Sequence, residues 1–233
     1  MVQAMIQWTS KHAKPEVTFF NLLVEMCNNS SNERIGIFLS NTPGSVNNAT
    51  ATTAVFLMIS VFRGFSYAES SLRQLKWKPG DSGYMRDLEG KTLAILGLGG
   101  IGTRLAELAH AFRMRIIYFS RRRNPLAPGF CEYVEEVEEM IRQADVLSIH
   151  IPLRPETTGL VGERWIRMLK PGAVIINTAR GKVIDEEALI RALEDRHVRF
   201  SLSYSAETIK FFVSLVALAW MFFHMNLRST HDY

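Results

Sequence analysis

Short apolar runs alternate with segments of helical periodicity through most of the chain. The runs predict β-strands at 35–40, 91–96, 114–119, 130–134, 146–151 and 173–177. Apolar residues at helical spacing predict one helix or two joined helices at 46–77, and further helices at 135–144, 164–169 and 185–195. Asp185 is the predicted N-cap of the last helix, and 1–34 are expected to be irregular. Apolar strands that alternate with helices are typical of a parallel sheet covered on both faces, so the pattern predicts an α/β fold, a Rossmann-type doubly wound parallel sheet.

The strand at 91–96 leads directly into a glycine-rich turn. The turn is Gly97-Leu-Gly99-Gly-Ile-Gly102, and a helical pattern follows it through Phe112. Gly97 allows a tight turn, Gly99 removes the Cβ that would block a phosphate, and Gly102 lets the helix approach the sheet. The N-terminus of such a helix offers free N–H groups and a partial positive charge. Strand, turn and helix together predict a dinucleotide-binding site.

The loop after the strand at 114–119 is basic. In an NAD site a carboxylate roughly 20 residues beyond the glycines accepts hydrogen bonds from the ribose hydroxyls. Here that place holds Ser120, Arg121, Arg122 and Arg123, with no carboxylate. A hydroxyl followed by guanidinium groups suits the 2′-phosphate of NADP. We therefore expect NADP rather than NAD, the alternative being a basic loop that only faces solvent.

The composition is that of an ordinary globular protein, with 47% hydrophobic residues, 21% charged residues and a net charge of +4. The mild charge, locally concentrated at 121–123, gives no indication of a nucleic-acid partner. Two cysteines, Cys27 and Cys131, are too few for a disulfide framework and fit a reducing compartment. Since the N-terminus has no secretory pattern, a cytoplasmic location is expected. No metal site is predicted.

Three further segments carry a family resemblance. The runs are 145–160 (DVLSIHIPLRPETTGL), 168–189 (MLKPGAVIINTARGKVIDEEAL) and 41–46 (NTPGSV), and each matches a motif of one known enzyme family. Over about 35–197 the chain resembles the D-isomer-specific 2-hydroxyacid dehydrogenases. With its arginine loop it is most similar to their NADP-dependent glyoxylate/hydroxypyruvate reductase branch.

The resemblance implies roles for individual residues. Arg180 matches the arginine that binds the substrate's carboxylate and keto oxygen, a task that suits a planar guanidinium. His150 matches a structural position at a strand end rather than a catalytic base. The other implied residues contact the cofactor: Thr42, Gly100, Ile101, Ile151, Pro152, Thr178 and Ala179.

The chain also departs from the family. The resemblance ends near His197, before the place where the family carries a catalytic Glu–His pair, and 1–34 are too short for the substrate-side domain. The expected division is a remnant of the substrate domain at 1–40, a dinucleotide-binding domain at 41–197 and a divergent apolar tail at 198–233. A chain truncated at both ends, possessing little or no activity, is the simplest explanation. Loss of general acid catalysis alone lowers rates by about 10²–10⁴-fold.

The tail contains an unbroken apolar run at 211–223. Its 13 residues fall short of the roughly 20 that cross a bilayer, so a membrane anchor is less expected than a buried helix or an unselected sequence.

Two functions are consistent with these sequence features. The first is hydride transfer from NADPH to a small 2-oxo acid such as glyoxylate or hydroxypyruvate, giving the D-2-hydroxy acid. The alternative is a non-catalytic dinucleotide-binding module, similar to the corepressors that use the same fold. The sequence leaves open whether the chain forms a homodimer through 50–67, because the apolar face of this segment could equally belong to the core.

Overall fold

The computed structural model describes residues 17–19, 38–40, 44–77 and 86–203. The chain forms two compact units, 1–46 and 47–233. In the first, β1 (Val17–Phe19) pairs in parallel with β2 (Phe38–Ser40). β2 lies within the predicted strand 35–40, but the prediction that 1–34 are irregular is wrong for β1, because three residues are too few to show periodicity. Cys27, Thr42 and the apolar run 211–223 lie outside the described residues.

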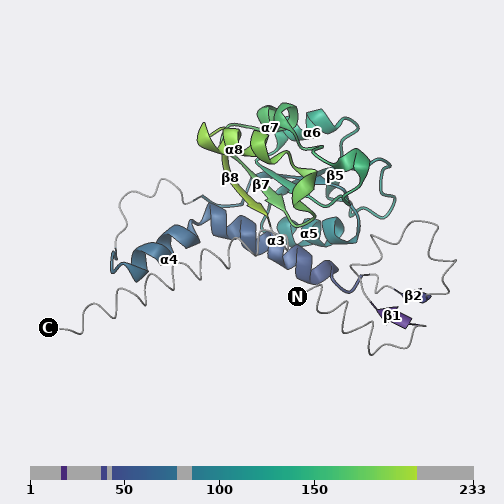
Figure 1. Ribbon diagram of the computed structural model, residues 1–233, viewed down its shortest axis with the longest axis horizontal. Helices are drawn as coiled ribbons and strands as arrows, with labels where there is room; N and C mark the ends of the chain where they lie inside the picture. The colour runs from purple at the N-terminus through teal and green to yellow at the C-terminus, as the bar shows by residue number, and fades with distance from the viewer. Residues whose placement is uncertain (1–16, 20–37, 41–43, 78–85, 204–233) are drawn as a thin grey trace. The chain divides into compact units, whose positions relative to one another are not determined.

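The second unit is built on a parallel sheet of six strands in the order β5-β4-β3-β6-β7-β8. Figure 1 labels β5, β7 and β8 of this sheet. The chain runs from β3 at the centre of the sheet outward through β4 to β5. It then crosses to the other side of β3 and continues through β6 and β7 to β8. This is the doubly wound order, with its switch point between β3 and β6, and it confirms the predicted fold class. The strands are β3 (Thr92–Leu96), β4 (Arg115–Phe119), β5 (Cys131–Tyr133), β6 (Val146–Ile149), β7 (Ala173–Asn177) and β8 (Val198–Ser203).

The sheet continues beyond the boundary predicted at residue 197. β8 pairs with β7 from Val198 opposite Ala173 to Ser203 opposite Asn177, with one irregularity near Val174. Its sequence, Val-Arg-Phe-Ser-Leu-Ser, alternates apolar and polar residues, which fits a strand at the end of a sheet. Placing 198–203 in the divergent tail is therefore wrong.

Helices cover both faces of the sheet (Figure 1). α3 (Asn47–Phe62) and α5 (Gly100–Ala111) share one buried cluster with Leu93 and Ile95 of β3, while Ala94 and Leu96 of the same strand pack into a second cluster on the opposite face. This division follows from the alternation of side chains along a strand. The second cluster is covered by α6 (Val137–Gln143), α7 (Glu163–Met168) and α8 (Glu186–Glu194).

The predicted helical region at 46–77 forms two helices. α3 ends at Phe62, and α4 (Phe65–Arg73) begins after Gly64, whose φ of 62° is left-handed and suits glycine. The pair is bent by 64°, and within the described ranges no single helix is long and apolar enough to cross a membrane. At the other end of the unit, Asp185 caps α8 as predicted, since its carboxylate accepts a hydrogen bond from the N–H of Ala188 at 3.1 Å.

Candidate functional site

Four loops follow the carboxyl ends of neighbouring strands and therefore lie along one edge of the sheet. They begin at Gly97 after β3, Ser120 after β4, His150 after β6 and Thr178 after β7. β4, β3, β6 and β7 are consecutive in the sheet. Open α/β sheets bind ligands at this edge, beside the switch point. The structure thus gathers the predicted site residues at one edge, apart from Thr42, which it does not describe.

The glycine turn is shaped by close contacts that exclude side chains. Gly97 has a φ of +97°, and a Cβ there would lie 2.9 Å from the carbonyl oxygen of His150. A Cβ on Gly102 would lie 2.5 Å from the carbonyl oxygen of Gly97. By contrast, a Cβ on Gly99 would meet nothing within 4 Å. Gly97 and Gly102 are therefore required by the packing of the loop, while Gly99 leaves open surface where a phosphate can approach.

The N-terminus of α5 faces this open surface and is not capped by a side chain. Its N-cap is Gly99, and its first turn carries no acidic residue. The N–H of Thr103 bonds to the carbonyl oxygen of Gly99 at 2.8 Å and starts the helical ladder. The N–H groups ahead of it have no partner within a helix. A pyrophosphate can accept hydrogen bonds from them.

Ser120 and Asn124 hold the glycine turn from the neighbouring loop. The N–H of Leu98 donates to Oγ of Ser120 at 3.0 Å, and Nδ2 of Asn124 donates to the carbonyl oxygen of Leu98 at 2.9 Å. Ser120, predicted as a phosphate contact, thus orders the turn through its oxygen, and its hydroxyl proton can still be donated. Sequence reasoning missed Asn124, whose only signal was a polar residue after the arginine run.

The three arginines of the basic loop are exposed. Arg121, Arg122 and Arg123 make no ion pair or side-chain hydrogen bond with residues that the structure describes. Most other exposed arginines of this unit do have carboxylate partners, such as Arg115 with Glu132 at 2.6 Å. The loop therefore offers uncompensated positive charge next to the glycine turn.

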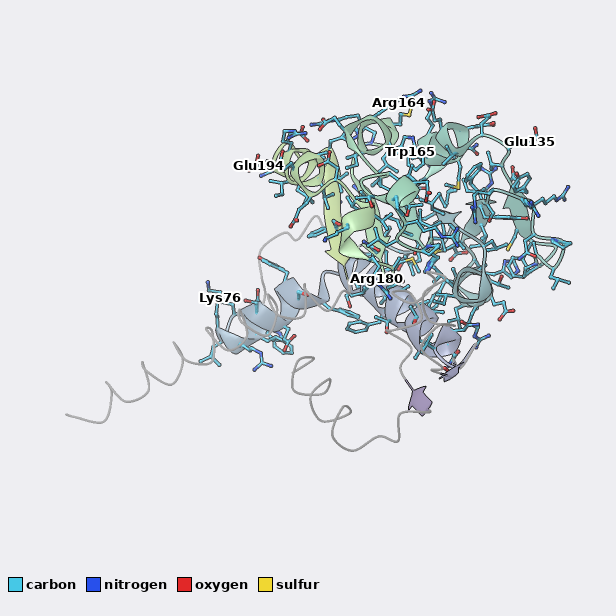
Figure 2. The ribbon with its side chains drawn as sticks, turned by 45° about the vertical axis from the view of Figure 1, so that its right-hand side comes forward. Lys76, Glu135, Arg164, Trp165, Arg180 and Glu194 are labelled. Atoms are coloured by element: carbon cyan, nitrogen blue, oxygen red, sulfur yellow. The ribbon has the colours of Figure 1, made fainter. Side chains whose placement is uncertain are left out.

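A buried amide organises the loop that carries Arg180. The side chain of Asn177 is 1% exposed. Its Nδ2 donates to the carbonyl oxygen of Arg180 and its Oδ1 accepts from the N–H of Ala179, both at 2.9 Å. Arg180, labelled in Figure 2, is exposed, and its guanidinium donates to the carbonyl oxygen of Ala179 at 3.0 Å. Sequence reasoning did not identify Asn177 as a positioning residue, although a polar side chain ending a buried strand was the available signal.

Thr178 carries an unsatisfied hydroxyl at this edge. The residue is 8% exposed, and its Oγ1 is buried with no hydrogen-bond partner among the described residues. Leaving a buried polar group unpaired costs about 1–3 kcal/mol. The fit to a dinucleotide comes instead from the glycine turn and the N-terminus of α5, where no side chain occupies the place that a pyrophosphate would take.

His150 lies between the glycine turn and the Arg180 loop. Its Nε2 is 2.8 Å from Oγ of the buried Ser148, one of the two groups donating to the other. Burial lowers the pKa of His150 to about 4, so the imidazole is neutral at physiological pH. A neutral ring already bonded to its own strand is consistent with a structural role.

The remaining titratable groups suggest no second catalytic centre in the described ranges. His110 stacks on Phe130, and Nε2 of His197 lies 3.1 Å from the carbonyl oxygen of Ile166. Burial, aided by Glu107, raises the pKa of Cys131 to about 11, which disfavours its reactive thiolate. No group of three or more His, Cys, Asp or Glu side chains that could hold a metal ion occurs in the part of the chain that the structure describes.

Comparisons with known proteins agree with this geometry. The family model "D-isomer specific 2-hydroxyacid dehydrogenase, NAD binding domain" matches residues 55–203. A glyoxylate reductase of Thermococcus litoralis is 41% identical over 168 residues, 69% of this chain and 50% of that protein. A 4-methyl-2-oxopentanoate reductase A of Aspergillus oryzae is 43% identical over 164 residues, 70% of this chain and 49% of the other.

Among solved structures, a glyoxylate reductase from Paecilomyes thermophila is 42% identical, with a TM-score of 0.68 over 72% of this chain and 51% of that one. The chain spans about half the length of the curated relatives it matches.

Proposed function

The chain belongs to the D-isomer-specific 2-hydroxyacid dehydrogenase family, and from this we propose that it binds NADPH and reduces a small 2-oxo acid of the glyoxylate or hydroxypyruvate type. The observation that carries the proposal is the open surface over Gly99 beside Arg121, Arg122 and Arg123, which form no ion pair with any residue that the structure describes. The product would be the D-2-hydroxy acid. Relatives named for glyoxylate reduction support the choice of substrate class.

The cofactor's phosphates would bind in two places. The pyrophosphate would accept hydrogen bonds at the N-terminus of α5, near Gly99, Gly100 and Ile101. The 2′-phosphate would lie against Arg121 and Arg122, where charge-assisted hydrogen bonds favour it over a bare ribose hydroxyl. Thr178, Ala179, Ile151 and Pro152 would line the nicotinamide end.

Arg180 would hold the substrate. A 2-oxo acid presents a planar carboxylate beside a carbonyl, and one guanidinium can donate to both. When bound, the reduced nicotinamide supplies a hydride to the carbonyl carbon. Arg180 would stabilise the negative charge that develops on the carbonyl oxygen, and this oxygen would then take a proton from water. Asn177 keeps the backbone of the Arg180 loop in place.

A homodimer remains a prediction. On α3, Ala54 and Met58 are buried in the core of the unit, whereas Phe56 is 62% exposed and Phe65 of α4 is 50% exposed. The two helices therefore contribute to the core and also leave aromatic side chains on the surface.

The test compares two cofactors and two variants. We expect wild-type protein to bind NADPH more tightly than NADH, and Arg121→Ala/Arg122→Ala to lose about 1–3 kcal/mol of NADPH binding per lost contact while NADH binding changes little. A matched control is Arg164→Ala/Arg142→Ala, which removes two arginines that pair with Glu138 on the α6–α7 surface. Fluorescence titration measures each affinity.

Equal losses for both cofactors would show that the loop does not distinguish the phosphate. Oxidation of NADPH in the presence of glyoxylate tests the reaction itself. Tight binding without turnover would favour the non-catalytic module.

A further inference from the structure

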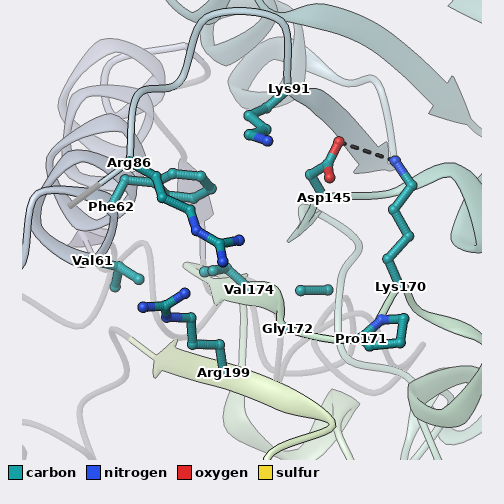
Figure 3. Close-up of a pocket in the computed structure, with 11 residues that line it drawn as sticks. Val61, Phe62, Arg86, Lys91, Asp145, Lys170, Pro171, Gly172, Val174 and Arg199 are labelled. Atoms are coloured by element: carbon teal, nitrogen blue, oxygen red, sulfur yellow. Dashed lines mark hydrogen bonds and ion pairs between the residues drawn. The ribbon is translucent and has the colours of Figure 1, made fainter. Parts of the chain in front are cut away.

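A second basic site lies at the opposite edge of the sheet. The amino ends of β3, β6, β7 and β8 meet there, together with the C-terminal end of α3. They enclose a hollow whose walls include four cationic side chains and, among its described lining residues, one carboxylate, Asp145. Figure 3 shows Arg86, Lys91 and Arg199 extending toward this hollow. Because the glycine turn follows the carboxyl ends of the strands, this hollow is separate from the dinucleotide site.

The carboxylate of Asp145 is already engaged. Its Oδ2 accepts from the N–H of Thr92 at 2.9 Å and from Nζ of Lys170 at 3.0 Å (Figure 3). Asp145 and Lys170 therefore largely neutralise each other. The positive charge that remains on the lining comes from Arg86 and Lys91, while Arg199 also lines the hollow.

The carboxylates of the segment before β3 are also occupied elsewhere. Asp87 pairs with Arg63 at 2.6 Å, and Glu89 pairs with Arg113 at 3.0 Å. The side chains of Arg86 and Lys91 make no ion pair or hydrogen bond with residues that the structure describes. Like charges held near each other repel, and an anion between them would relieve that repulsion.

Apolar side chains complete the wall. Val61 and Phe62 of α3 and Val174 of β7 line the hollow beside the cations. Low-dielectric walls strengthen the field of nearby charges and focus it on a bound ion. A guanidinium and an ammonium that line the same hollow suit an anion with several oxygens, as phosphate has.

We propose that this hollow, lined by Arg86, Lys91 and Arg199, binds a phosphate dianion, either free or as a small phosphate ester. Arg86 and Lys91 supply the charge-assisted hydrogen bonds. The apolar wall at Phe62 can contact the organic part of an ester. This proposal does not depend on the function proposed above.

The test titrates the full ¹⁵N-labelled chain with inorganic phosphate in low-salt buffer and follows the backbone amide signals of Lys91, Gly172 and Val174. We expect these signals to shift, and Arg86→Met/Lys91→Met to weaken the binding that they report by about tenfold or more. Methionine keeps the length of each stem, and the hydrogen bond from the N–H of Arg86 to the carbonyl oxygen of Phe62 is retained. If the double variant fails to fold, Arg86→Met alone tests the same contact on an exposed side chain.

The control variant is Arg121→Met/Arg122→Met, which removes the same charge at the other edge and should leave the shifts at Lys91, Gly172 and Val174 unchanged. A parallel titration with phenyl phosphate identifies the source: tighter binding than phosphate indicates an ester, and equal affinity indicates the free ion. Amide signals at the hollow that do not move, or that move equally in Arg86→Met/Lys91→Met, would overturn the proposal.

Discussion

Two loops at the carboxyl edge of the sheet are shaped in opposite ways. The glycine turn at 97–102 depends on atoms that are missing, because a Cβ at Gly97 or Gly102 would collide with backbone oxygens. The Arg180 loop depends on atoms that are present, because the amide of Asn177 bonds to both Ala179 and Arg180. The first loop should therefore tolerate no side chain at Gly97 or Gly102, and the second should not tolerate loss of the Asn177 amide. The site combines a surface defined by shape with a side chain placed by hydrogen bonds.

The largest expected effect comes from adding one methyl group to the glycine turn. Gly102→Ala places a Cβ 2.5 Å from the carbonyl oxygen of Gly97 and 3.1 Å from Cγ2 of Ile95. Backbone must shift, so we expect a loss of about 1–3 kcal/mol in the free energy of unfolding together with loss of dinucleotide binding. Gly99→Ala adds a methyl group in open space and should weaken binding while leaving stability nearly unchanged.

Denaturant unfolding and NADPH titration separate these two effects. Gly129→Ala is the control, since its added Cβ also meets nothing within 4 Å and the residue lies away from the turn. Equal loss of stability in Gly99→Ala and Gly102→Ala would contradict the distinction between packing and ligand access.

In the Arg180 loop, by contrast with the glycine turn, the loss of a side-chain group should be the damaging change. Asn177→Ala leaves the N–H of Ala179 and the carbonyl oxygen of Arg180 without their partner, at a cost of about 1–3 kcal/mol in stability. Arg180→Lys should leave stability unchanged, because the side chain is exposed. It should lower kcat/KM for glyoxylate by about 10²-fold, since one ammonium cannot hold both substrate groups.

Thermal unfolding and steady-state kinetics measure the two variants, and weaker binding of the non-reactive analogue oxalate gives a readout independent of turnover. If Arg180→Lys binds oxalate as tightly as wild type does, Arg180 does not hold the substrate.

His150, between the two loops, should give a smaller effect that depends on pH. In the unfolded chain its imidazole gains a proton near the ordinary pKa of 6.5, whereas in the folded protein it stays neutral down to about 4. Protonation favours the unfolded state between these values, so this contribution to stability is complete above pH 6.5 and falls as the pH drops toward 4. The slope is at most about 1.4 kcal/mol per pH unit.

Unfolding free energies measured across this range test the effect. His150→Gln is the matched variant, because its amide can still bond to Ser148 and does not titrate. A slope that is unchanged in His150→Gln would assign the pH dependence to other groups.

Several features of the fold could be predicted from local sequence. Continuous apolar runs predicted β3, β4, β6 and β7 to within two residues. A central strand is buried on both faces, so its consecutive residues are mostly apolar and the run can be recognised in the sequence. The glycine turn was equally readable, since its shape depends on three residues close together in the chain. β8 was missed because the predicted boundary followed the limit of the family resemblance, although its own residues alternate as a strand's do.

The sequence by itself determined the fold class and the position of the glycine turn, and its family resemblance singled out Arg180 as the predicted substrate-binding arginine. Only the tertiary structure decided which side chains hold those parts in place: Asn177 under the Arg180 loop, Ser120 and Asn124 beside the glycine turn, and Lys170 on Asp145 at the opposite edge. The physical reason is the distance along the chain over which each effect acts. Propensity and periodicity act between residues a few positions apart, whereas Leu98 meets Ser120 and Asp145 meets Lys170 only after parallel strands have brought separate segments to one edge of the sheet.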